Sequence, residues 1–135
     1  MSASIDRMNP PALPDASKVG YSQISIAYPG TLAFVSGQVA WRPDGAAVPG
    51  SLAEQTAIVV ENLRAALDAL QATTDDIVLM RIYLTDLTSE TQRIAMGELI
   101  RFLDGAQPSL TGIGVAALAG PDLRIEVEMV VQVAA

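Results

Sequence analysis

Apolar residues recur with helical spacing in one segment of the chain. Between residues 51 and 72 they form a single stripe, which predicts an amphipathic helix. The stripe consists of Leu52, Val59, Leu63, Ala66, Leu67 and Leu70. Ser51–Glu54 fits a capping box, in which a serine oxygen caps a backbone N–H while the glutamate reaches back. Ser89–Gln92 fits a second one and predicts another helix, ending near Leu103.

Alternating and β-branched segments predict five strands around these helices. The strands cover residues 21–27, 31–40, 76–85, 109–118 and 123–133. Pro29-Gly30 is a turn signal, so the first two strands are expected to form a hairpin. Residues 1–19 are proline-containing and aperiodic, which predicts an extended lead-in.

The resulting order is β-β-α-β-α-β-β without an internal linker, which predicts one α+β domain over residues 1–135. Two helices of this length can cover only one face of a sheet. Along the last strand, Ile125, Val127 and Met129 share one face, while Glu126 and Glu128 share the other. The second face mixes charged and apolar residues, which favours an oligomer contact over free solvent exposure.

Composition limits the function classes. The chain has 135 residues, of which 50% are hydrophobic and 17% charged, as expected for a folded domain. No apolar run is long enough to span a bilayer, and the N-terminus lacks a signal-peptide pattern, so a soluble, cytoplasmic protein is expected. A net charge of −7 with scattered cations argues against binding nucleic acid.

Two residue types are missing from the sequence, cysteine and histidine. Their absence excludes disulfides, thiolate nucleophiles, Ser-His-Asp triads and nearly every zinc or copper site. A general acid or base must then be a carboxylate, a tyrosine, Lys18 or a bound water. Asp75-Asp76 is the only adjacent acidic pair, and we interpret it as the entry of a strand. No metal site is predicted.

Several short motifs, taken in order, resemble those of the RidA (YjgF) family. They are Asn9-Pro10, Gly20–Ser22, Phe34–Gln38, Glu61–Leu63, Asp75–Val78, Tyr83–Asp86, Gly114–Leu118 and Ile125–Glu128. The resemblance covers nearly the whole chain. It implies a chorismate-mutase-like fold with a mixed six-stranded sheet and two helices on one face. It also implies a homotrimer with small-molecule pockets between subunits, and hydrolysis of reactive enamines and imines without a cofactor.

The same resemblance implies the pocket residues. Glu126 corresponds to the catalytic carboxylate that orients water or moves a proton, and the substrate-binding positions are Tyr21, Gly37, Leu110, Thr111 and Gly112. In the active deaminases an arginine holds the substrate carboxylate at the position of Leu110. Deamination of 2-iminobutyrate-like acids is therefore not expected to be efficient, and a less anionic or bulkier substrate is favoured.

Other interpretations remain open at this point. Glu126 is equally explained by an ion pair with Arg81 or Arg124, and Tyr21 by an edge position on a strand. The protein is either a hydrolase of a small enamine, imine or carbonyl-type metabolite or a non-catalytic trimer that binds a small molecule. Ribonuclease activity, attached to some members of the family, is disfavoured by the acidic chain and its lack of histidine.

Overall fold

The fold is built on a four-stranded sheet, in a computed structural model that describes residues 5–134. Its strand order is β3 (Thr31–Gln38), β6 (Ile125–Val133), β4 (Ile77–Leu84), β5 (Ser109–Gly114). β6 pairs antiparallel with β3 and β4, whereas β4 and β5 are parallel. Parallel neighbours need a crossover connection, and α2 supplies it. The α+β class predicted from the sequence is confirmed.

The remaining strands, β1 (Ile5–Met8) and β2 (Ile24–Ala27), form a separate antiparallel ribbon. The expected hairpin between β2 and β3 is wrong, because β2 pairs with β1 and β3 pairs with β6. Residues 5–19 of the expected lead-in are extended in β1 and also contain a short 3₁₀ helix, η1 (Ala16–Val19). Residues 1–4 of that lead-in lie outside the described residues.

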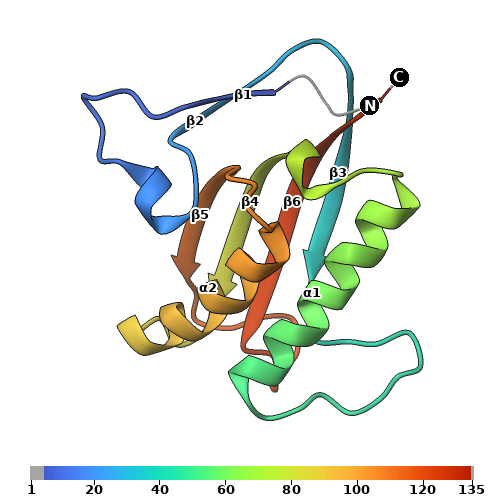
Figure 1. The fold of residues 1–135 in the computed structure, drawn as a ribbon. Helices are drawn as coiled ribbons and strands as arrows, with labels where there is room; N and C mark the ends of the chain where they lie inside the picture. Colours follow the sequence, from blue (N-terminus) through green and yellow to red (C-terminus); the bar gives the residue numbers. More distant parts are fainter. Residues whose placement is uncertain (1–4, 135) are drawn as a thin grey trace.

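Both predicted helices are present, and Figure 1 shows them packed on the same face of the sheet. α1 spans Leu52–Ala69 and is capped by Ser51, whose side chain accepts from the Glu54 N–H. α2 spans Ser89–Leu103, but its capping box is Thr88 with Thr91 rather than Ser89 with Gln92. The threonine pair binds the free backbone N–H groups at the start of the helix, so the cap lies one residue before the predicted Ser89.

The core lies between the helices and the sheet. Among the side chains of β4 and β6 that point toward the helices, Met80, Ile82, Val127 and Met129 are each 2% exposed or less. They pack against Leu63 of α1 and Leu99 of α2 within one cluster. The predicted alternation of β6 is therefore confirmed.

The opposite face of the sheet carries no helix (Figure 1). Phe34 is 76% exposed there and Leu32 is 44% exposed. Arg81 and Glu128 form an ion pair on this face with an N–O distance of 3.6 Å. Large apolar side chains remain in solvent on this face, which fits the mixed character read from the sequence.

The η2 turn (Thr74–Asp76) leads directly into β4. Asp76 is buried, and its carboxylate accepts from the Thr73 N–H at 2.8 Å. The acidic pair therefore marks the entry of a strand, as interpreted from the sequence. Within residues 5–134, no group of three or more potential metal-ligating side chains is close enough to hold a metal ion.

Candidate functional site

A first cavity of about 380 Å³ lies between β5, α2 and the segment after η1. It contains three of the residues expected at the site, Tyr21, Leu110 and Gly112. Its other lining residues are Val19, Ile82, Leu84, Leu87, Gln92, Ala95 and Met96. Apart from the Tyr21 hydroxyl and the Gln92 amide, the lining side chains are apolar, and none is charged.

Strand register determines which residues reach this cavity. Leu110 is opposite Met80 and Gly112 is opposite Ile82, so both lie on the helix-covered face. Thr111 is opposite Arg81 and therefore points to the other face. The structure separates Thr111 from the two residues with which the sequence had grouped it.

Tyr21 is brought to the cavity by the turn that follows η1. Gly20 has φ +95°, a left-handed conformation that suits glycine. A Cβ at Gly20 would lie 2.2 Å from the Ile100 Cδ1 atom of α2, so the turn also packs too closely for a side chain. Ser22, which follows Tyr21, donates its N–H to the Pro108 carbonyl and aligns the segment with β5.

A second cavity of about 360 Å³ contains the two other expected residues, Gly37 and Glu126. Gln38, Val39, Trp41, Asn62 and Ala119 complete its lining. The β3–β6 register shifts between Val35 and Gln38, which places a bulge at Ser36-Gly37. Bulges of this kind commonly reorient a side chain beside a site.

The side chain of Glu126 packs directly against Gly37. A Cβ at Gly37 would lie 2.3 Å from Glu126 Oε2 and 2.7 Å from its Cγ. No side chain fits at position 37 without displacing the glutamate, so glycine allows this close approach. The sequence predicted both residues at the site, and the structure brings them into contact.

Glu126 forms no hydrogen bond or ion pair within residues 5–134. Arg81 pairs with Glu128 instead, and Arg124 forms no ion pair within the same range. The structural interpretation of Glu126 as a cross-strand ion pair is therefore not supported. Its carboxylate lines the cavity without an ion-pair or hydrogen-bond partner in the described part of the chain.

Tyr83 and Glu128 form a separate polar pair on the open face of the sheet. The Tyr83 hydroxyl donates to Glu128 Oε1, and this hydrogen bond, with desolvation and the negative charge of Glu128, raises the pKa of the phenol above its ordinary value. Arg81 partly opposes this shift, while Glu126 adds to it. The pKa of Tyr83 therefore reflects the charged side chains around it on this face.

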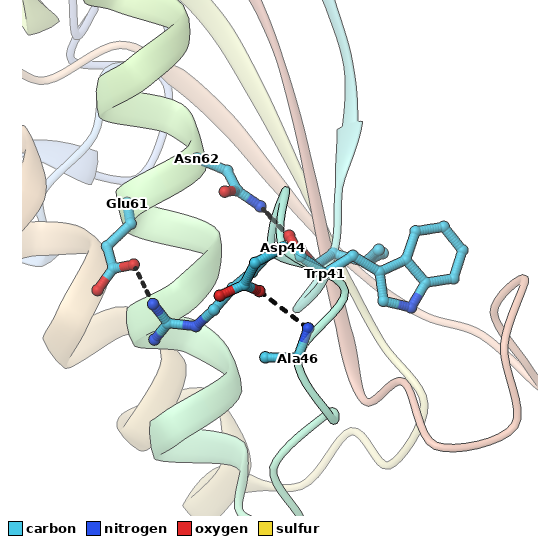
Figure 2. Close-up of polar contacts among 7 residues, drawn as sticks. Trp41, Asp44, Ala46, Glu61 and Asn62 are labelled. Atoms are coloured by element: carbon cyan, nitrogen blue, oxygen red, sulfur yellow. Dashed lines mark hydrogen bonds and ion pairs between the residues drawn. The ribbon is translucent and has the colours of Figure 1, made fainter.

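The loop that carries Trp41 is attached to α1 at two points (Figure 2). Asn62 donates both amide hydrogens, to the Val39 carbonyl at 3.1 Å and to the Trp41 carbonyl at 3.0 Å. Arg42 forms an ion pair with Glu61 at 3.1 Å. These contacts fix the start of the loop, where Trp41 itself is 53% exposed.

Gln55 of α1 supports the approach to β6. Its side chain is fully buried and donates to the Pro49 and Asp122 carbonyls at 2.9 and 2.8 Å. It also accepts from the Arg124 N–H at 2.8 Å, two residues before Glu126. Sequence reasoning missed Gln55, Trp41 and Gln92. The unique tryptophan was the one visible signal.

The two cavities share no lining residue. Leu110 is opposite Met80 on the helix-covered face, whereas Glu126 is opposite Tyr83 on the open face. β4 lies between their strands in the sheet. One copy of the chain therefore does not bring Leu110 and Glu126 into a common pocket.

The chain resembles known proteins over most of its length. The sequence model of the family described as "Endoribonuclease L-PSP" matches residues 12–133. The RutC family protein YjgH of Escherichia coli is 37% identical over 98 residues, covering 73% of this chain and 74% of that protein. A RutC family protein of Pyrococcus abyssi is 32% identical over 103 residues, covering 75% of this chain and 78% of that protein.

Solved structures agree with these sequence matches. The conserved Rid family protein YyfB of Yersinia pestis superimposes with a TM-score of 0.88 and 31% identity. That match covers 96% of this chain and 98% of the other. RidA from an Antarctic Psychrobacter superimposes with a TM-score of 0.70 and 25% identity, covering 84% and 88% of the two chains.

Proposed function

The chain belongs to the Endoribonuclease L-PSP (RidA/YjgF) family, and from that premise we propose that it adds water to a small reactive enamine, imine or carbonyl-type metabolite. One observation carries the proposal most directly. Glu126 lies in a cavity against Gly37, without an ion-pair partner among residues 5–134. An unpaired carboxylate in a cavity is a suitable group to orient water and accept its proton.

For an imine, the proposed reaction runs in two steps. Water adds to the carbon of the protonated C=N bond while Glu126 accepts one water proton, and a neutral carbinolamine forms. Glu126 then returns this proton to nitrogen, the C–N bond breaks, and the hydroxyl proton passes through Glu126 to the departing ammonia, which leaves as ammonium while the carbonyl product remains. No metal or cofactor is part of this scheme.

The substrate is expected to lack a carboxylate, or to bind poorly if it has one. No lysine or arginine lines either cavity, and Leu110 stands where the deaminases of the family have their arginine. A charge-assisted pair with arginine is typically worth about 1.5–3 kcal/mol. At ~1.4 kcal/mol per tenfold, its absence corresponds to binding weaker by roughly ten- to a hundredfold.

The complete pocket is proposed to form between two copies in a homotrimer. Tyr21, Leu110 and Gly112 would come from one copy, and Gly37 and Glu126 from the next. The proposal is supported by the placement of Leu110 and Glu126 on opposite faces of the sheet. The exposed apolar residues of the helix-free face provide a surface for such contacts.

A second candidate is a non-catalytic trimer that binds a small molecule. The first cavity favours this alternative, because its lining offers mainly apolar contacts and no charged group. Apolar pockets with a few polar groups are typical of small-molecule binding sites. In contrast, ribonuclease activity is disfavoured by the net charge of −7 and the lack of histidine. The absence of a helix that could cross a membrane, among residues 5–134, does not separate the candidates.

Ammonia release distinguishes the two candidates. Imines would be generated enzymatically in the assay, both 2-iminobutyrate and the imine of an uncharged ketone. We expect faster hydrolysis of the imine that lacks a carboxylate, and loss of that activity in Glu126→Gln. Glu128→Gln, on the same strand and face, is the matched control and should keep it. Wild-type protein that accelerates neither reaction would favour the binding protein, and activity retained in Glu126→Gln would remove Glu126 from catalysis.

A further inference from the structure

The second cavity has a distinctive set of polar groups. Glu126 is its only charged lining residue. Asn62 donates both amide hydrogens to the Val39 and Trp41 carbonyls. Gln38 donates its Nε2 to the Ser36 carbonyl at 3.1 Å, and its Oε1 accepts no hydrogen bond within residues 5–134. The side-chain amides therefore offer a ligand mainly acceptors, because their donors are largely occupied.

Trp41 also lines this cavity. Its ring lies close to the Gly120 turn, because a Cβ at Gly120 would be 3.5 Å from Trp41 Cζ2. The Trp41 carbonyl is held to α1 by Asn62, and the indole ring extends away from that helix (Figure 2). A tryptophan face attracts cations through its quadrupole more strongly than phenylalanine or tyrosine does. The indole N–H is the one side-chain donor that Trp41 contributes.

From this chemistry we infer that the second cavity selects a cationic nitrogen, such as a protonated imine or an ammonium group attached to an apolar body. The N–H groups donate to Glu126 and to the Gln38 oxygen, and the positive charge lies against the indole ring. A carboxylate ligand would instead meet the Glu126 charge with no cation to offset it. The inference rests on the proposed function in taking Glu126 as the group that meets substrate, and it adds the class of ligand.

The cationic form also matches the proposed reaction. An iminium carbon is more electrophilic than that of a neutral imine, so binding the protonated form prepares it for attack by water. The carboxylate that attracts the cation would be the same group that accepts the water proton. Trp41 is then a specificity-determining residue, which makes no bond to the reacting atoms.

Three probes of similar shape test the inference directly: cyclohexylammonium, cyclohexanol and cyclohexanecarboxylate. Trp41 is the single tryptophan of the chain, so the indole emission reports on this cavity alone. We expect a saturable change with cyclohexylammonium, at an affinity about tenfold or more above that of cyclohexanol. Cyclohexanecarboxylate should bind most weakly. Equal or tighter binding of either other probe, or no saturable binding of cyclohexylammonium, would overturn the inference.

Variants assign the effect to named groups. Glu126→Gln should reduce the preference for cyclohexylammonium over cyclohexanol to within about twofold, whereas Glu128→Gln, with the same change in net charge, should retain it. Trp41→Leu, followed by calorimetry, should weaken cyclohexylammonium about three- to tenfold and Trp41→Phe less. If Glu128→Gln abolishes the preference as completely as Glu126→Gln does, the selectivity comes from the general field of the protein and the inference is wrong.

The outcome is separable from that of the proposed function. Protein that binds cyclohexylammonium with the expected dependence on Glu126, but releases no ammonia from imines, would refute the hydrolase and leave the inference standing. Hydrolysis that depends on Glu126 without any preference among the three probes would support the hydrolase and refute the inference.

Discussion

The substitution Gln55→Leu tests how the approach to Glu126 is held. Leucine keeps a similar volume in a site that is fully buried, but it removes three hydrogen bonds of 2.8–2.9 Å. The Arg124 N–H and the Pro49 and Asp122 carbonyls then lose their partners. Each buried group left without a partner costs about 1–3 kcal/mol. Asp122 is exposed and Pro49 half-buried, so their carbonyls regain some hydration and the lower end applies.

The expected loss of unfolding free energy is therefore about 3 kcal/mol, a large part of the 5–15 kcal/mol typical of a domain. Urea denaturation at fixed protein concentration would measure it, and the midpoint should fall by about 1–3 M at a typical m-value. The control is Gln92→Leu on α2, an exposed glutamine whose side chain forms no hydrogen bond within residues 5–134. It should shift the midpoint little. A Gln55→Leu midpoint equal to that of the control would refute the assigned role of these hydrogen bonds.

Three further predictions concern the cavities and the open sheet face. Leu110→Arg should raise 2-iminobutyrate hydrolysis by roughly tenfold or more, unlike Leu110→Gln, and an inert but folded arginine variant would contradict this. Gly37→Ala should displace the Glu126 carboxylate and lower activity at least about tenfold while the urea midpoint changes less than in Gln55→Leu. Wild-type activity in Gly37→Ala would show that the close packing is not needed. The hydrogen bond to Glu128 raises the pKa of Tyr83 above 10.0. The stabilisation that this bond gives the fold is therefore present below the pKa of the unfolded state and is lost as the pH rises through the pKa of the folded state. The wild-type minus Tyr83→Phe absorbance difference should therefore titrate above an ordinary tyrosine, and titration at or below pH 10 would refute the shift.

Local patterns predicted the elements better than their pairing. The stripe and the Ser51 cap fixed the start of α1, because caps and periodicity depend on neighbouring residues. The hairpin of β2 with β3 failed because β3 pairs with β6, about a hundred residues away, and a turn signal carries no information about such a partner. β1 is four residues long, which is too short for its alternation of apolar and polar residues to predict a strand.

The candidate site was predictable where a motif identified its residues. Gly37 and Glu126 were both expected, and their contact follows from the bulge between β3 and β6. Gln55 was not expected, since its partner Arg124 is 69 positions away. Thr111 and Leu110 point to opposite faces, because adjacent residues of a strand do so, and a role for Thr111 in the site stays a prediction.

Mixed oligomers provide the most direct test of a hydrolytic pocket shared between two copies. Glu126→Gln damages one half of the proposed site, and Leu110→Asp damages the other by placing a carboxylate in the apolar cavity. Each variant alone should be a trimer by light scattering and inactive toward the imine that lacks a carboxylate. Trimers formed from an equal mixture should regain activity, because about one site in four combines two intact halves. Mixed trimers no more active than their parents, or an active monomer, would contradict the shared pocket.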